Sequence, residues 1–334
     1  MKVKTIALIY ETRKDAENTP HNDIQDLYHW REDCEVEAVI HSIEALGFKV
    51  IPVGSPYSAV NQVERLKKEI QFVFNISVGF SSRFRLALGP SLYELCGIPY
   101  SGADPYGKLL SQNKQLMKSF FDKQGISTPE WTYADRNAVL KELNYPEFPL
   151  IVKPAYEGSS IGIERDSVVH SFEELLVKAE RVRDELNMPL MIERFIEGRE
   201  LKAGFIGNHT IESYGLFEDL KESGESLQND FLYFQAKKEG KYRKVFQDFD
   251  DPMYQTLLND CRKIYDLFLP VDYGTFDIRL DRNGKHYFLE FNADATLHPE
   301  RTFSKCFEFK GIPYHQVIER ILKTSFKRWG IAWN

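Results

Sequence analysis

The chain has 334 residues, 43% of them hydrophobic and 28% charged, which is typical of an ordinary globular protein with room for two or three domains. The net charge of -7 argues against a nucleic-acid surface, which normally carries a basic excess. No apolar run is long enough for a signal sequence or a membrane span, and the four cysteines form no CxxC pair. We therefore expect a protein of the reducing cytoplasm, without a disulfide framework, a zinc site or a nucleic-acid or membrane partner.

Strands alternate with helices in the first third of the chain. KTIALIY, FKVIPVG and QFVFNIS read as strands, and residues 32–46, ending at Gly47, and 60–70 read as helices. This alternation predicts an open α/β domain, and places residues 10–13 and 75–79 beside a possible substrate site at the carboxyl ends of the strands. No GxGxxG follows the first strand, which argues against a dinucleotide-binding oxidoreductase.

The middle of the chain carries a strand followed by a glycine-bounded loop. A helix is predicted at 109–124 and contains Lys114, and the strand FPLIVK ends at Lys153. The following loop, EGSSIG, offers backbone N–H groups and the hydroxyls of Ser159 and Ser160, which suits a phosphate. The loop does not match GxxxxGK[ST], and a plain turn is the alternative.

Two later segments combine charge with aromatic residues. PLMIERFIEGREL predicts a strand and a turn bracketed by Glu193 and Glu200, each of which taken alone reads as a surface charge. Residues 217–249 contain FQAKKEGKYRKVF, either a solvated basic face or a mobile lid over phosphates. Further helices are predicted at 171–186, 252–268 and 313–329.

The segment YGTFDIRLDRNGKHYFLEFNADATLHP predicts a β-hairpin whose turn is DRNG. Because strand side chains alternate, Asp277 and Arg279 share one face, and Glu290 and Asn292 share a face of the partner strand. If the two faces coincide, two carboxylates and an amide converge with a guanidinium nearby. Such oxygen ligands suit Mg2+, and a solvated polar face is the alternative.

Lys114, VKPAYEGSSIGI, IERFIEGREL, FDIRLD and LEFN occur in this order, and with them the chain resembles the ATP-grasp superfamily. Within it, the chain is similar to the D-alanine–D-alanine ligases and their uncharacterised relatives over nearly its whole length. The resemblance implies a multi-domain α/β (α+β) fold, in which a Rossmann-like N-terminal domain precedes a two-subdomain ATP-grasp fold. The implied bounds are 1–111 for the N-terminal domain, 112–193 for the central small subdomain and 194–334 for the C-terminal subdomain with metal site and lid.

The resemblance also implies a role for individual residues. Lys114 and Lys153 would hold the α- and β-phosphates, and the γ-phosphate would be held by the loop of Ser159 and Ser160 and by the lid lysine Lys237. The adenine would contact Glu193, Arg194 and Ile196, and the ribose would contact Glu200. Two Mg2+ or Mn2+ ions would be held by Asp277, Glu290 and Asn292, and Arg279 would neutralise a phosphate or an intermediate.

The implied reaction is ATP-dependent and ADP-forming. ATP would convert a carboxylate, in an amino acid or another acid, into an acyl phosphate, and an amine would displace phosphate to form an amide or peptide bond. Lysines, Mg2+ and backbone N–H groups suit the charge that develops, and a closed loop and lid would exclude water. The expected partners are these small molecules, and a homodimer is the default assembly.

The residues expected to bind the second substrate depart from the ligase pattern. In ADATLHPERT, Thr296 stands where the ligases have a glycine, and Arg301 stands roughly where a serine binds the second amino acid's carboxylate. An arginine can clamp a carboxylate through two hydrogen bonds, which favours a larger or more acidic acceptor. The Glu-Val-Ser segment of the ligases, whose glutamate holds the amine of the first D-alanine, has no clean counterpart here. Trp30, Arg31 and Glu32 occupy that region, and Glu32 is a further candidate for substrate binding. Thr275 replaces an arginine, and Lys238 replaces the tyrosine after the lid lysine.

These departures favour a ligase whose substrates are not two D-alanines. Two alternatives remain: a genuine D-alanine–D-alanine ligase of peptidoglycan synthesis, and a nucleotide-binding ATP-grasp protein without catalysis. Intact Asp277, Glu290 and Asn292 argue against the second alternative, since a dead site typically loses its metal ligands. His298 is proposed as a loop residue rather than a base, because Pro299 follows it.

Overall fold

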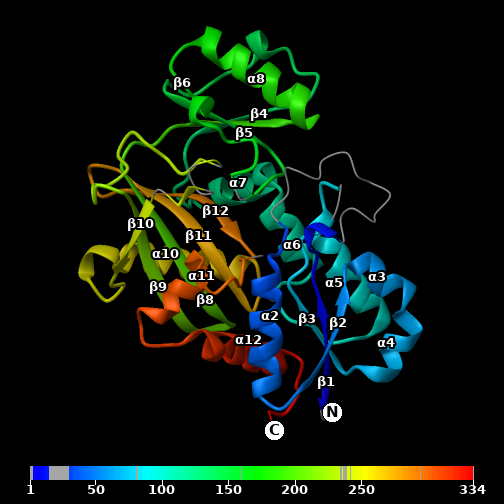
Figure 1. The fold of residues 1–334 in the computed structure, drawn as a ribbon. Coiled ribbons are helices and arrows are strands. Elements are labelled where there is room, and N and C mark those ends of the chain that lie inside the picture. Colours follow the sequence, from blue (N-terminus) through cyan, green and yellow to red (C-terminus); the bar gives the residue numbers. More distant parts are fainter. Residues whose placement is uncertain are drawn as a thin grey trace.

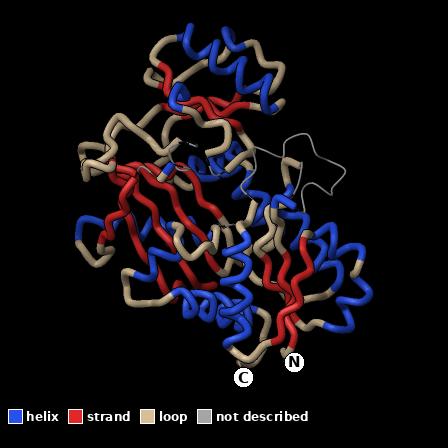
Figure 2. The backbone as a smooth tube through the Cα atoms, in the orientation of Figure 1, coloured by secondary structure: helices blue, strands red, loops and turns tan. Residues whose placement is uncertain are grey.

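The computed structural model describes residues 3–14, 30–79, 82–158, 160–233, 235, 239–240, 242–293 and 295–333. These residues form three β-sheets, each associated with helices (Figure 1; Figure 2). The sheets of the N-terminal and C-terminal parts lie beside each other, and the sheet from the middle of the chain lies above them in Figure 1. No helix in the described ranges has both the length and the apolar character that a membrane span requires.

A parallel sheet in the order β2-β1-β3 forms the N-terminal part. The predicted helix stop is confirmed at Gly47, whose φ is 87°. The single helix predicted at 60–70 is wrong, because Gln62 leaves the helical conformation (φ -120°, ψ 10°) and separates two short helices. The elements are β1 (Thr5–Ile9), α2 (Asp33–Ala45), β2 (Lys49–Gly54), α3 (Pro56–Asn61), α4 (Val63–Glu69), β3 (Phe72–Asn75) and α5 (Arg85–Cys96).

An antiparallel sheet in the order β4-β7-β5-β6 forms the central part. The single helix predicted at 109–124 is wrong, because Asn113 is extended there and caps a new helix by accepting a hydrogen bond from the Leu116 amide (3.1 Å). Lys114 is therefore the first residue of its helix. The elements are α6 (Pro105–Gln112), α7 (Lys114–Lys123), β4 (Trp131–Ala134), β5 (Leu150–Pro154), β6 (Val168–Val169), α8 (Phe172–Leu186), β7 (Leu190–Arg194) and two 3-10 turns (Leu140–Glu142, Arg165–Ser167).

An antiparallel sheet in the order β10-β9-β8-β11-β12 forms the C-terminal part. The predicted hairpin is confirmed as β11 and β12. In its turn Asp281 accepts hydrogen bonds from the Asn283 and Lys285 amides (both 2.9 Å), and Gly284 takes the positive φ of 80°. The segment 217–249, predicted as a lid, contains the end of β9 and all of β10. The elements are β8 (Arg199–Asn208), β9 (Thr210–Lys221), β10 (Tyr242–Gln247), a 3-10 turn (Pro252–Tyr254), α10 (Gln255–Leu267), β11 (Tyr273–Leu280), β12 (His286–Asn292), α11 (Thr302–Glu308) and α12 (Tyr314–Arg328).

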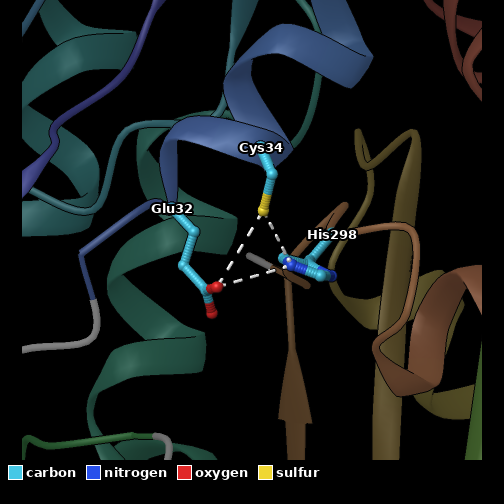
Figure 3. Close-up of side chains that lie close together, drawn as sticks. All are labelled: Glu32, Cys34 and His298. Atoms are coloured by element: carbon cyan, nitrogen blue, oxygen red, sulfur yellow. Dashed lines mark hydrogen bonds and ion pairs between the residues drawn. The ribbon is translucent and has the colours of Figure 1, made fainter.

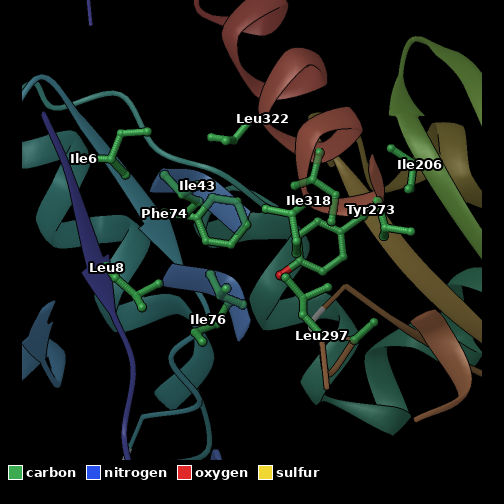
Figure 4. Close-up of a cluster of buried hydrophobic side chains, with 14 of the residues drawn as sticks. Ile6, Leu8, Ile43, Phe74, Ile76, Ile206, Tyr273, Leu297, Ile318 and Leu322 are labelled. Atoms are coloured by element: carbon green, nitrogen blue, oxygen red, sulfur yellow. The ribbon is translucent and has the colours of Figure 1, made fainter. Parts of the chain in front are cut away.

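One hydrophobic core joins the N-terminal and C-terminal parts (Figure 4). Ile6 of β1 and Phe74 of β3 belong to the same buried cluster as Tyr273 of β11 and Ile318 and Leu322 of α12. The central sheet packs with α8 around a separate core. Two of the three sheets therefore share their interior, and the domain bounds predicted at 111/112 and 193/194 stay predictions.

The C-terminal sheet has two unlike faces. One face buries alternate residues of β8 and β11, such as Leu201 and Phe276, in a core with α10. On the other face, Ile206 and Tyr273 belong to the core shared with the N-terminal part, whereas Lys202 lies further along the same face of β8. The charged end of this face therefore lies beyond the shared core, and it forms one wall of the candidate site.

Candidate active site

Three side chains of the β11–β12 hairpin converge, as the strand alternation predicts. Asp277 pairs with Glu290 in the antiparallel register, and Asn292 lies two residues further along β12. The Asn292 Nδ2 donates to Asp277 Oδ2 (3.2 Å) and to Glu290 Oε1 (3.1 Å), so a hydrogen-bond donor holds the two carboxylates together. Mg2+ prefers carboxylate and amide oxygens as ligands, and Asp277, Glu290 and Asn292 offer oxygens of both kinds, as predicted for a metal site.

Two lysines from other elements contact these carboxylates. Lys114 Nζ lies 3.1 Å from Glu290 Oε2, and Lys202 of β8 forms an ion pair with Asp277, its direct partner in the β8–β11 register. Burial acts to raise the pKa of Glu290, but the charge of Lys114 and hydrogen bonds hold that pKa well below its usual range. Burial acts to lower the pKa of Lys202, but Asp277 and Glu200 raise it above its usual range. Glu290 and Lys202 therefore remain charged at neutral pH.

Glu193 lies between two buried lysines. Lys153 Nζ donates to Glu193 Oε2 (2.9 Å), and Lys118 Nζ lies 3.3 Å from the same atom. Burial acts to raise the pKa of Glu193, but the two ammonium groups lower it below its usual value. Burial also lowers the pKa of Lys118 to about 8, against the attraction of Glu193. Lys118 was not predicted, although it follows Lys114 by four residues, the spacing that places two side chains on one helix face.

A cavity of about 70 Å3 brings together most of the residues predicted to bind a nucleotide. Ser160 has a positive φ of 63°, and its hydroxyl donates to the Leu232 carbonyl (3.1 Å), so the loop after β5 contacts the segment after β9. The other predicted residues lining this cavity are Lys114, Lys153, Glu193, Arg194, Ile196, Glu200, Asp277, Arg279 and Glu290. Ser159, Lys237 and Lys238 lie outside the described residues.

Arg279 lines this cavity but is held by the protein itself. Its guanidinium donates to the Gly198 carbonyl (3.1 Å) and the Asp230 carbonyl (2.6 Å), and lies over the Phe195 ring, 5.0 Å from the ring centroid. Burial lowers its pKa, with an opposing contribution from Glu200. Arg279 therefore ties β11 to the segment after β7 and the segment after β9. Its action on a phosphate or an intermediate stays a prediction.

A second cavity, of about 310 Å3, adjoins the first and shares part of its wall. The two predicted substrate residues meet there, since Arg301 Nη2 donates to Glu32 Oε1 (2.8 Å). The Thr296 hydroxyl donates to Glu35, which the sequence analysis missed (3.0 Å). The shared wall includes Lys114, Glu157, Lys202, Asp277 and Glu290. The residues predicted to bind the nucleotide and those predicted to bind the second substrate therefore line two adjoining cavities.

Glu32, Cys34 and His298 form a cluster beside this second cavity (Figure 3). The Cys34 Sγ lies 3.2 Å from His298 Nε2, which lies 3.5 Å from Glu32 Oε2. Their ligand atoms are close enough to hold a metal, but His298 Nδ1 accepts a hydrogen bond from the Glu300 amide (3.0 Å). In a neutral imidazole the proton then lies on Nε2, where a metal would need the lone pair. The cluster therefore links α2 to the 295–301 loop, consistent with His298 as a loop residue.

Comparison with known proteins identifies related sequences over most of the chain. A family model described as D-ala D-ala ligase C-terminus matches residues 119–323. A D-alanine–D-alanine ligase of Desulfotalea psychrophila is 33% identical over 72% of this chain and 74% of that protein. A D-alanine–D-alanine ligase of Aquifex aeolicus is 29% identical over 69% of this chain and 75% of that protein. The uncharacterized protein y4sG of Sinorhizobium fredii is 23% identical over 90% of each chain.

Solved structures share the fold at lower sequence identity. The D-alanine–D-alanine ligase of Bacillus anthracis, complexed with ATP, matches with a TM-score of 0.73 and 17% identity, covering 98% of each chain. The VanG D-Ala:D-Ser ligase of Enterococcus faecalis matches with a TM-score of 0.71 and 18% identity, covering 96% of this chain and 99% of that chain. These likenesses confirm the predicted fold, with an open α/β domain followed by two further subdomains.

Proposed function

Because this chain belongs to the D-alanine–D-alanine ligase family within the ATP-grasp superfamily, we propose that it is an ATP-dependent ligase that joins a carboxylate to an amine. The observation that carries the proposal is the convergence of Asp277, Glu290 and Asn292 beside Lys114. Lys114, Asp277 and Glu290 line both cavities, and Asn292 lines the larger one. The smaller cavity is lined by most of the residues proposed to bind the nucleotide, and the larger one leaves room for a second substrate.

In the proposed chemistry, residues of the protein bind the phosphates and the metal and help to exclude water. Lys114 and Lys153 would hold the phosphates, and Asp277, Glu290 and Asn292 would hold Mg2+, one or two ions, with Mn2+ as a substitute. When bound, the metal supplies positive charge to the phosphate oxygens. The loop that carries Ser160, already in contact with the segment after β9, would help to exclude water.

The proposed reaction has two steps and releases ADP and phosphate. A carboxylate oxygen attacks the γ-phosphorus of ATP, and ADP leaves with the bonding electron pair. The amine nitrogen then attacks the carbonyl carbon of the acyl phosphate, loses a proton, and phosphate leaves. Charge builds up on the transferring phosphoryl group and on the tetrahedral intermediate, and the lysines of the shared wall supply compensating charge.

The proposed acceptor carries a carboxylate, and it differs from D-alanine because Arg301 stands roughly where the ligases bind that carboxylate with a serine. Arg301 and Glu32 support this proposal, because together they offer a cation and an anion at the second cavity. Their side chains are 42% and 51% exposed, so a ligand reaches them without rearrangement of the core. An arginine suits a bidentate carboxylate contact, and an amino group suits the glutamate.

Turnover is tested with purified protein, ATP, Mg2+ and pairs of amino acids, with phosphate release as the readout. We expect amino-acid-dependent phosphate release and an amide product detected by mass spectrometry. Robust turnover with D-alanine alone would overturn the proposed specificity and identify a D-alanine–D-alanine ligase. Nucleotide binding without amino-acid-stimulated ADP formation would instead identify a protein without catalysis.

Replacing Arg301 tests where the acceptor binds. We expect Arg301→Met to raise the KM of the acceptor by about tenfold or more, since a charged hydrogen bond contributes about 1.5–3 kcal/mol, and to leave the KM of ATP unchanged. Arg282→Met is the matched control, because Arg282 pairs with the surface residue Glu197 (3.1 Å) away from both cavities. Equal KM values for Arg301→Met and the wild type would exclude this position as a carboxylate contact.

A further inference from the structure

Lys202 occupies a position in the site that the predicted ligand set does not include. Its side chain is 11% exposed and lines both cavities. It forms an ion pair with Asp277 and lies 3.8 Å from Glu200. An ammonium group therefore contacts one of the two carboxylates that are proposed to bind the metal.

The backbone fixes this contact. Lys202 and Asp277 are directly opposed on neighbouring antiparallel strands, and Asp277 is in turn opposed to Glu290. Directly opposed residues project from the same face with their Cβ atoms about 4.5–5.5 Å apart. The Cβ atoms of Lys202 and Asp277 thus stay neighbours in any state that keeps the register of the sheet, while the two side chains are free to exchange partners.

The second carboxylate is engaged in the same way. Glu290 contacts the Lys114 ammonium at 3.1 Å, and the Asn292 amide donates to both carboxylates. A bare dication that approached this pair would meet two positive groups and would have to compete with them for the same oxygens. A nucleotide changes this balance, because its phosphates bring several negative charges that the ammonium groups attract.

We propose that Lys202 is a positioning residue that holds Asp277 in an ion pair until a nucleotide binds, so that the divalent metal enters together with the nucleotide and not before it. The inference rests on the proposed function, since it takes Asp277, Glu290 and Asn292 as metal ligands. It adds the order in which metal and nucleotide bind, and it attributes this order to Lys202 on β8.

Lys244 provides a matched control on the same sheet. It forms an ion pair with the buried Asp219 (3.2 Å), and the two residues are directly opposed on β10 and β9. Lys244→Met therefore removes the same charge and the same kind of cross-strand pair. Lys244 also lines the second cavity, but Asp219 is not among the proposed metal ligands. The change therefore removes a positive charge near the site and keeps the contacts of Lys202 with Asp277 and of Lys114 with Glu290.

The experiment measures Mn2+ binding by calorimetry in nucleotide-free protein, for the wild type, Lys202→Met and Lys244→Met. We expect weak binding to the wild type and to Lys244→Met, and a dissociation constant at least tenfold lower for Lys202→Met, which is about 1.4 kcal/mol. Mn2+ alone should also raise the melting temperature of Lys202→Met more than that of the wild type. If the methionine variant does not fold, Lys202→Gln takes its place, because its amide can still donate to Asp277 without a charge.

A parallel titration with a non-hydrolysable ATP analogue separates the two levels of the argument. The proposed function and the role of Lys202 are both supported if Mn2+ strengthens binding of the analogue and if Mn2+ alone binds weakly to the nucleotide-free wild type. Tight Mn2+ binding to the nucleotide-free wild type, or equal Mn2+ affinity in the wild type and the Lys202 variant, overturns the role of Lys202 while the proposed function stands. No binding of the analogue at any metal concentration overturns the proposed function and the inference with it.

Discussion

The charged side chains of the site are held by one another. Glu193 is 1% exposed and contacts Lys118 and Lys153, and Glu290 contacts Lys114. Each carboxylate has its pKa lowered by these contacts, so each contributes to stability only while it is ionised. The lysines around these two carboxylates therefore stabilise their ionised forms.

Glu193→Gln tests this arrangement through pH. The folded-state pKa of Glu193 lies below the usual 4.5, so its contribution is fully present above pH 4.5 and is lost as the pH falls below that value. We expect the variant to lose about 3–5 kcal/mol of unfolding free energy at pH 7, because two buried lysines lose their partner. Its unfolding free energy should also fall less steeply between pH 5 and pH 3, measured by urea denaturation.

Glu185→Gln is the control for that measurement. Glu185 is 61% exposed and lies 3.7 Å from Arg181 on the surface of α8, a pair worth at most about 0.5 kcal/mol. Its pH profile should follow that of the wild type. If the Glu193→Gln profile also followed the wild type, Glu193 would not be ionised through its lysine contacts.

Most elements were predicted from the sequence, and the errors have local causes. The hairpin was predicted because the turn residues and the strand alternation agree. The helices at 60–70 and 109–124 were each predicted as one element, because their hydrophobic pattern continues across Gln62 and Asn113, where the backbone turns. The strand β10 was missed because FQAKKEGKYRKVF is too polar to read as a strand. Pairing with β9 and the packing of Phe246 against Phe309 hold it in place.

Close packing between a strand and a helix gives a test at the scale of elements. A Cβ at Gly215 of β9 would lie 2.4 Å from the Cys306 carbonyl oxygen of α11, whereas a Cβ at its partner Gly204 of β8 would make ordinary contacts from 3.4 Å. We expect Gly215→Ala to lower the free energy of unfolding by about 1–3 kcal/mol, because α11 must move. Gly204→Ala should change it by less than about 0.5 kcal/mol, as measured by chemical denaturation. If the two substitutions changed the free energy of unfolding by the same small amount, α11 would be able to move away from Gly215 without loss of stability.

At the scale of the whole molecule, the site depends on contacts that no local pattern contains. The convergence of Asp277, Glu290 and Asn292, the proposed metal ligands, was predicted because these residues lie close in sequence. The contact of Lys202 with Asp277 and the pairing of Arg301 with Glu32 depend on sheet order and on the packing of the chain's two ends. The motifs predicted which residues belong to the site, whereas their partners required the three-dimensional arrangement.

The shared core predicts that the N-terminal and C-terminal sheets unfold together. Ile318 of α12 is fully buried in the cluster that contains Phe74 of β3 and Ile206 of β8. We expect Ile318→Ala to cost about 2–5 kcal/mol and to increase hydrogen exchange in β3 and β8 alike. Val182→Ala, in the separate core under α8, should increase exchange mainly in the central sheet. Increased exchange in β8 alone after Ile318→Ala would show that the two sheets open independently.

The core shared by β1, β3 and α12 also bears on how the protein is made. A ribosome produces β1 and β3 well before α12, so the nascent chain exposes the inner side of the N-terminal sheet until α12 has been made. Uncovered apolar strands are prone to aggregate and are bound by chaperones. The strands and α12 must meet before this surface is closed, so the N-terminal sheet reaches its final packing only after α12 has been translated.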